Sequence, residues 1–125
     1  MKEDNMKEVI CYYDLSSDIL GIKVNHDFSY EETVEMDDGM LLDFDVNNVP
    51  VSLEVLDASQ RFNLPKESLN NIVCFEMDVF IDEKSISINA KIGVLINNVE
   101  NNQFFKSHAS NYGNFPNASV QLALV

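Results

Sequence analysis

Asp43, Asp45, Asn47 and Glu54 have the residue types and the spacing that could hold a hard cation. Oxygen-bearing side chains recur at every second position from Asp43, and Glu54 stands where a calcium loop has its bidentate glutamate. Asn48, however, stands where such a loop needs glycine, and neither flank has the 3.6-residue periodicity of a helix. Because a metal motif without its structural context is weak, the sequence predicts no metal site and favours a β-hairpin here.

The same stretch alternates between apolar and polar residues, which is typical of strands with one buried face. A two-residue type I′ turn at Asn47-Asn48 pairs Leu42 with Leu53, so the apolar side chains of both strands share one face. The other face then gathers carboxylates that could meet arginine or lysine side chains of a partner. These carboxylates are Asp43, Asp45 and Glu54.

The chain is strongly acidic. Its 125 residues include 21 acidic and 8 basic residues, which give a formal net charge of -13. Such a charge repels phosphate backbones and anionic lipid, so we expect no nucleic-acid and no membrane binding, and we expect any charged partner to be basic. Residues 1–71 hold 16 acidic and 5 basic residues, whereas residues 72–125 hold 5 and 3. The acidic character therefore belongs to the first half of the chain.

Signals for catalysis are weak in this sequence. It has two histidines, no nucleophile elbow and no glycine-rich phosphate loop. Cys11 and Cys74 lie far apart and are expected to be reduced thiols. The sequence therefore predicts a protein that is not an enzyme and that binds no cofactor.

The first ten residues are charged where a signal peptide needs an apolar run. No stretch reaches the ~18 consecutive apolar residues of a membrane span. We therefore expect a cytoplasmic protein.

Strand patterns dominate the chain. Alternating runs predict hairpins over residues 9–24, 41–55 and 73–96, and a last strand over residues 119–125. In the third hairpin, a turn at Asp82-Glu83 pairs Val79 with Ile86. Residues 97–117, rich in Asn, Gly and Ser, are predicted to be mainly loop with a short strand around residues 103–106.

One segment near residues 58–71 has helical signals, because Pro65 fits the first turn of a short helix. The fold class predicted from these patterns is mainly β, bordering on α+β. Antiparallel hairpins form a two-layer β-rich domain with one short helical segment. The 125 residues are predicted to form a single domain.

Three segments, YYDLSSDILGI, DDGMLLDFDVNN and VSLEVLDAS, together resemble the domain-of-unknown-function family 2283. The family pattern runs from Tyr-Asp through Asp-Gly and Asp-x-Asp to a glutamate in an aliphatic strand before Ala-Ser. Gly21 departs from it, since the family often has tyrosine there, and Asn47-Asn48 replaces an Asp-Gly turn. The matching positions are Tyr13, Asp14, Asp18, Leu20, Ile22, Asp38, Gly39, Asp43, Asp45, Glu54, Ala58 and Ser59.

The resemblance covers about residues 9–60, an acidic β module, and residues 72–125 are predicted to be a β-rich extension packed on it. Members of the family have no established activity. Their frequent setting beside small toxins implies an antitoxin-like binding role. The predicted function is therefore that of a non-catalytic protein-binding module that docks a basic partner. The predicted contact residues are Asp43, Asp45, Glu54, Asp14 and Asp18.

Two alternatives belong to other classes. One is a site for a divalent metal or a small molecule, built on Asp43, Asp45 and Glu54. The other is a self-assembling structural module, such as a homodimer that forms through an exposed edge like the C-terminal strand.

Overall fold

Nine strands and three short helical segments make up the part of the chain that the computed structural model describes, residues 6–125 apart from the side chain of Asp38. Strands dominate it, as the alternating sequence predicts. In chain order the elements are β1 (Met6–Asp14), β2 (Ile19–Val24), β3 (Tyr30–Glu35), the 3-10 helix η1 (Asp37–Gly39), β4 (Met40–Asp45), β5 (Pro50–Val55), α1 (Ala58–Phe62), the 3-10 helix η2 (Lys66–Asn70), β6 (Ile72–Ile81), β7 (Ser85–Ile96), β8 (Val99–Ser110) and β9 (Ala118–Leu124).

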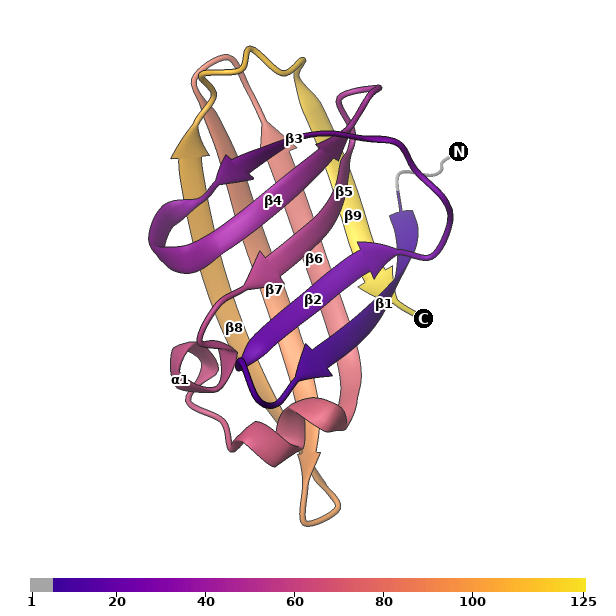
Figure 1. The fold of residues 1–125 in the computed structure, drawn as a ribbon, viewed down its shortest axis with the longest axis vertical. Helices are drawn as coiled ribbons and strands as arrows, with labels where there is room; N and C mark the ends of the chain where they lie inside the picture. Colours follow the sequence, from indigo (N-terminus) through magenta and orange to yellow (C-terminus); the bar gives the residue numbers. More distant parts are fainter. Residues whose placement is uncertain (1–5) are drawn as a thin grey trace.

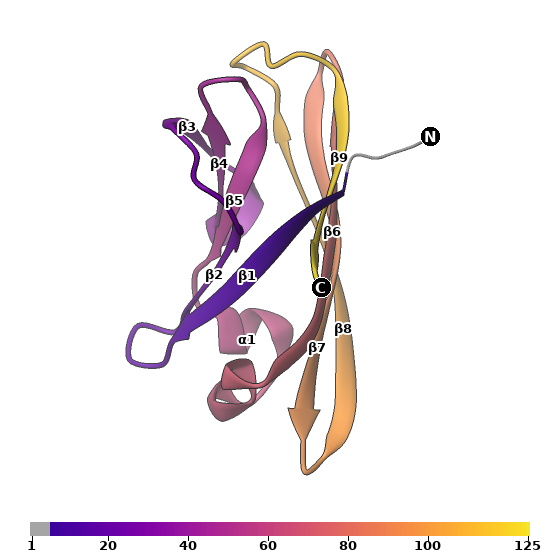
Figure 2. The same cartoon turned by 90° about the vertical axis from the view of Figure 1, so that its right-hand side faces the viewer.

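The described strands form one curled sheet in the order β3-β4-β5-β2-β1-β9-β6-β7-β8. In Figure 1, β3, β4, β5 and β2 lie in front of β6, β7 and β8. The turned view of Figure 2 shows two layers, with β1 running diagonally from the first layer towards β9 in the second. α1 and η2 lie together at one end. The predicted mainly β, two-layer architecture with a short helical segment is confirmed.

β9 lies inside the sheet and not at its edge. It pairs in parallel with β1, from Met6 opposite Gln121 to Val9 opposite Leu124, and antiparallel with β6. This parallel pair is a correction, because the hairpin patterns predict only antiparallel neighbours. It also corrects the expectation that the C-terminal strand offers a free edge, since β9 is paired on both sides. The edges of the described sheet are β3 and β8.

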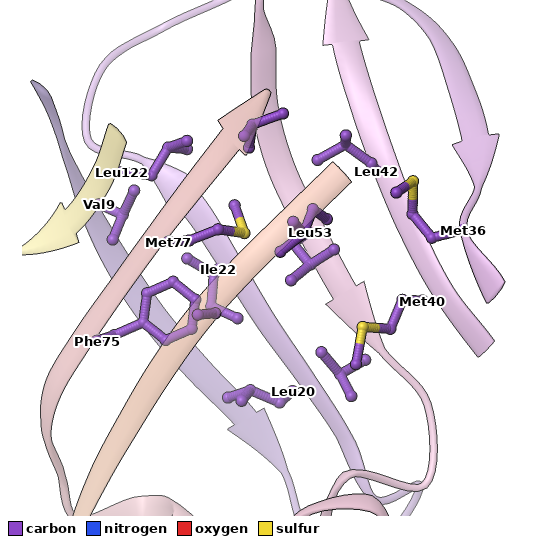
Figure 3. Close-up of a cluster of buried hydrophobic side chains, with 14 of the residues drawn as sticks. Val9, Leu20, Ile22, Met36, Met40, Leu42, Leu53, Phe75, Met77 and Leu122 are labelled. Carbon is purple, nitrogen blue, oxygen red and sulfur yellow. The ribbon is translucent and has the colours of Figure 1, made fainter. Parts of the chain in front are cut away.

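The core lies between the two layers and follows from the period of two along each strand. Figure 3 shows Ile22 and Leu53 of the first layer close to Phe75 and Met77 of the second. Each of these four side chains is completely buried, and burial of one such side chain stabilises a fold by about 1.5–3 kcal/mol. The core also includes Leu122 of β9, so residues 9–60 and residues 72–125 share it.

The β4–β5 hairpin confirms the pairing of Leu42 with Leu53, but its turn is longer than predicted. Asp45 and Val49 close the turn, and a bulge shifts the register after Asp43. Only Asn48 of the Asn pair has a positive φ, 63°, so the turn is not the predicted type I′. The extra residue leaves Val46 exposed to solvent.

The β6–β7 hairpin has the predicted faces in a different register. Val79 pairs with Ile88 and not with Ile86, because the closing pair of the turn is Asp82 with Ser85. The Asp82 carboxylate accepts hydrogen bonds from the backbone N–H groups of Lys84 and Ser85, at 2.9 and 2.8 Å, and so fixes this turn. A shift of two residues keeps every side chain on its predicted face.

β8 overturns the prediction that residues 97–117 are mainly loop. The strand covers Val99–Ser110 and pairs with β7 along its whole length without a bulge. The two residues of the β7–β8 turn, Asn97 and Asn98, have φ angles of 52° and 64°, as a type I′ turn requires. The Asn-Asn pair that forms such a turn is therefore this one and not Asn47-Asn48.

β3 (Tyr30–Glu35) is the strand that the sequence does not predict. It contains three glutamates and one valine, so it has no apolar alternation, and five of its six residues are exposed. The helical prediction for residues 58–71 is confirmed by α1 and η2. Within residues 6–125, no helix is long and apolar enough to cross a membrane.

Candidate functional site

The outer face of the first layer brings two of the predicted carboxylates together. Asp43 on β4 pairs with Ser52 on β5, and Leu41 pairs with Glu54, so Asp43 and Glu54 are diagonal neighbours. Such neighbours lie roughly 7–8 Å apart. Glu35 on β3 pairs with Leu41 and extends the same face. We call Glu35, Asp43 and Glu54 the acidic face.

Asp43 is tied to the edge strand beside it. The Thr33 hydroxyl donates a hydrogen bond of 2.6 Å to the Asp43 carboxylate, and the Tyr30 hydroxyl lies 2.8 Å from the Thr33 hydroxyl. This connection holds β3 against β4 through side chains as well as through the backbone. Within residues 6–125, the second Asp43 oxygen accepts no side-chain hydrogen bond, so it is available to a partner.

Tyr12 on β1 reaches across Gly21 towards the acidic face. Tyr12 pairs with Gly21, which in turn pairs with Glu54, and a Cβ atom on Gly21 would overlap the Tyr12 ring. Burial is the largest cause of the raised pKa of Tyr12, and the negative charges of Glu54 and Asp43 raise this pKa further. Tyr12 therefore borders the acidic face, and the residue is 48% exposed. Lys23 is the basic group here, with its Nζ 6.0 Å from the Tyr12 ring centre.

Asp45 has a different position and a structural role. Its Oδ1 accepts hydrogen bonds from the backbone N–H groups of Asn47, at 2.9 Å, and Val49, at 3.0 Å. These bonds organise the β4–β5 turn. The bulge that follows Asp43 separates Asp45 from the regular part of the acidic face.

Asp14 lies at the start of the β1–β2 turn and not on the acidic face. Its carboxylate accepts hydrogen bonds from the hydroxyls of Ser16 and Ser17, at 2.9 and 2.7 Å. Hydrogen bonds from Ser17 and Ser16 lower the pKa of Asp14, so this exposed group is a carboxylate at neutral pH.

Asp18 is buried, at 5% exposure, and its carboxylate is occupied within the chain. It accepts hydrogen bonds from the Tyr13 hydroxyl at 2.6 Å and from the N–H and the hydroxyl of Ser59 at 3.0 and 2.7 Å. Its backbone carbonyl accepts a bond of 2.9 Å from the N–H of Ala58. Asp57, the N-cap residue of α1, makes no side-chain hydrogen bond to the helix. Asp18, which lies in the β1–β2 turn, therefore supplies the acceptors for the first backbone N–H groups of α1.

The protonation of this buried cluster follows from its contacts. Burial raises the pKa of Asp18, but the hydrogen bonds from Tyr13 and Ser59 outweigh burial and lower it from its ordinary value. Burial raises the pKa of Tyr13, and so does its bond to Asp18. At neutral pH the cluster therefore holds a carboxylate and a neutral phenol.

Cys11 and Cys74 are free thiols, as the sequence predicts. Burial raises the pKa of Cys11 to about 12, so its thiolate is scarce at neutral pH. In a Cys74→Ser variant, we expect iodoacetamide at pH 7 to modify Cys11 at least ~100-fold more slowly than a free thiol. Unfolding in urea should restore fast modification. Rapid labelling of the folded variant would show that Cys11 is accessible and ionised.

Residues 43–54 belong to the β4–β5 hairpin, whereas a calcium loop of this type lies between two helices. The calcium-loop interpretation is therefore wrong. Among the residues that the structure describes, no group of three or more His, Cys, Asp or Glu side chains is arranged to hold a metal ion.

The structure therefore divides the five predicted contact residues. It brings Asp43 and Glu54 together, half-buried, on the outer face of the first layer, places Asp45 and Asp14 in separate turns, and buries Asp18. Sequence reasoning missed Tyr12 and Glu35. The signal for Tyr12 was Gly21, whose missing side chain leaves room for a neighbouring ring.

Comparisons with known proteins identify related chains. The model of a family described as a protein of unknown function, DUF2283, matches residues 11–59. An uncharacterized protein of Methanocaldococcus jannaschii is 34% identical over 89 residues, which cover 59% of this chain and 76% of that protein. A Methanosarcina mazei protein named "Putative hypoxanthine phosphoribosyltransferase" is 38% identical over 65 residues, which cover 52% of each protein. The chain thus matches about half the length of that relative. No solved structure gives a significant match.

Proposed function

We propose that this chain, which belongs to the DUF2283 family through residues 11–59, is a non-catalytic binding protein that docks a basic protein partner on its acidic face. The partner is a protein that it neutralises in an antitoxin-like manner. Complementary charge speeds and orients the encounter, and neighbouring apolar groups supply affinity.

The observation that carries this proposal is that Asp43 and Glu54, both half-buried, are diagonal neighbours on the outer face of the first layer. Two carboxylates at roughly 7–8 Å suit two basic side chains of a partner or one arginine between them. Within the described residues, neither carboxylate has an ion-pair partner within 4 Å, so their charges act outward. Ile10 and Tyr12, 40% and 48% exposed, lie on the same side of the sheet and offer apolar contact.

The contact surface that we propose is narrower than the sequence predicts. Asp18 is left out because all its hydrogen bonds lie within the chain, and Asp45 is mainly a turn residue. The activity in the name of the M. mazei protein is not extended to this chain, because the shared segment covers 52% of each. The cytoplasmic location stays a prediction.

Co-expression with the products of neighbouring reading frames tests the proposal. The tagged chain is purified in moderate salt, and mass spectrometry identifies what remains bound. We expect a stoichiometric basic protein. The absence of any such companion, when every neighbouring product is expressed, would contradict an antitoxin-like role.

Neutralising the acidic face should slow association with the captured protein. We expect the Asp43→Asn, Glu54→Gln double variant to associate about tenfold more slowly at low ionic strength, with a weaker salt dependence, in stopped-flow measurements. The matched control is Asp78→Asn, Glu76→Gln on β6, which removes the same charges from the other layer. Equal rates for both variants would remove the acidic face from the proposal.

A further inference from the structure

The two edges of the sheet differ in charge. β3 carries Glu31, Glu32 and Glu35, all exposed, and like charges along an edge oppose pairing with a second copy. β8 is 12 residues long and holds one carboxylate side chain, Glu100, and one lysine, Lys106. Within residues 6–125, no strand pairs with the far side of β8. β8 is thus a long edge without net charge.

The hairpin geometry shows which backbone groups of β8 point away from β7. In a two-residue hairpin the closing pair, here Ile96 with Val99, exchanges both backbone hydrogen bonds, and bonded and non-bonded pairs alternate from there. The N–H of Asn111 bonds to the carbonyl of Lys84 at the far end, which agrees with this alternation. The even-numbered residues of β8 therefore direct their N–H and C=O groups to the free edge.

The free part of this edge runs from the turn to Lys106. Beyond it, Asp37 of η1 accepts a hydrogen bond from Ser107 and lies 3.7 Å from His108, so η1 flanks that end of the strand. Phe104 is 73% exposed on the free part. An incoming strand would cover part of this ring as well as pair the backbone groups.

We propose that β8 pairs antiparallel with β8 of a second copy, about a two-fold axis through Gln103, so that one sheet continues through a homodimer. The free backbone N–H and C=O groups belong to the even-numbered residues of β8. The two copies can therefore form backbone hydrogen bonds only in registers that place even-numbered residues opposite even-numbered residues. With Gln103 on the axis, Glu100 of each copy lies opposite Lys106 of the other. A shift by one pair in either direction moves Glu100 opposite His108 or Phe104 and loses the charge match.

The distribution of charge agrees with this interface. Residues 72–125, which supply β8, hold 5 acidic and 3 basic residues, against 16 and 5 in residues 1–71. Joining two copies through β8 places the less acidic part of each chain at the contact. A symmetric contact of this kind closes on itself and does not grow into a fibre.

Charge exchange between Glu100 and Lys106 tests the interface and its register. Light scattering over a concentration series should give a dimer mass for the wild type. Glu100→Lys or Lys106→Glu alone places like charges opposite each other twice by symmetry, and should raise the dissociation constant about tenfold. The double variant, Glu100→Lys with Lys106→Glu, restores opposite charges and should dimerise as the wild type does.

Glu83→Lys in the β6–β7 turn is the matched control, because it makes the same charge change away from β8. Circular dichroism confirms that each variant is folded. A wild type that stays monomeric at every concentration overturns the proposal. So does a dimer that all the variants form equally well, since that dimer would use another surface. This test needs no basic partner, so its result is independent of the proposed function.

Discussion

Replacing Asp18 with alanine should lower the free energy of unfolding by about 2–4 kcal/mol. The variant removes a buried carboxylate that accepts three hydrogen bonds, from the Tyr13 hydroxyl and from the N–H and hydroxyl of Ser59. All three donors would then lie next to a cavity without a partner. The first turn of α1 would also lose its cap. Urea denaturation followed by circular dichroism measures the loss.

Asp18→Asn is the informative comparison, since Asp18 has a φ of 57° and asparagine tolerates this left-handed conformation better than alanine does. Its amide oxygen can accept from Ser59 while the charge is lost. We therefore expect Asp18→Asn to be less destabilising than Asp18→Ala. If alanine were tolerated as well as asparagine, the Asp18 cluster would contribute little to stability.

The Asp18 cluster also predicts a pH dependence. A carboxyl whose pKa is lower in the folded than in the unfolded chain binds fewer protons when folded, so it stabilises the fold above its unfolded pKa of about 3.9. That contribution disappears as the pH falls through the folded pKa. The stability difference between the wild type and Asp18→Asn should therefore be constant from pH 7 to about 5 and shrink below about pH 4. A difference that grows in acid would mean that the folded state binds the proton more tightly.

The sequence predicts which face of the sheet each side chain occupies, but it does not predict at which residues the turns lie. Alternation fixes which side chains are inward, because a slip of one residue would bury carboxylates such as Asp43. A slip of two residues costs no such burial, and this is the error in the β6–β7 hairpin, where Val79 pairs with Ile88. What fixes that register is the Asp82 carboxylate, which bonds two backbone N–H groups of the turn.

The two edge strands were harder to predict than the central ones. β3 and β8 each pair on one side only, so their sequences need fewer apolar residues. The asparagines of the β7–β8 turn and of the start of β8, at positions 97, 98, 101 and 102, resemble a loop, yet the pairing of β8 with the alternating β7 is continuous. The position of β9 depends on contacts between distant residues, and local patterns carry no information on those.

The candidate site shows the same division. The sequence predicts that the Asp43 and Glu54 carboxylates share the outer face, because both belong to one hairpin. It does not distinguish them from Asp18, although that carboxylate is buried. Asp18 and Ser59 are 41 positions apart, and only the packing of α1 against the β1–β2 turn brings them together. Positions that resemble the family pattern therefore include residues that hold the fold as well as residues available to a partner.

Replacing Phe115 with alanine should lower the free energy of unfolding by about 3–5 kcal/mol. Phe115 belongs to the loop between β8 and β9, and it is 4% exposed. Its ring stacks on Phe44 of β4, with centroids 3.9 Å apart and planes inclined by 16°. Asn111 fixes the loop around it, since its side chain accepts a bond from the N–H of Phe115 and donates one to the Phe115 carbonyl. The alanine variant would leave a cavity between the two layers.

Tyr112→Ala in the same loop is the control, because Tyr112 is 91% exposed and its truncation should change stability by less than about 0.5 kcal/mol. Urea denaturation of both variants separates the loss of a core contact from a change in the loop itself. Equal, small effects would mean that the loop docks without Phe115. A large effect confined to Phe115→Ala would mean that the contact between β4 and the β8–β9 loop helps hold β9 between β1 and β6. This contact would then help join residues 9–60 to residues 72–125.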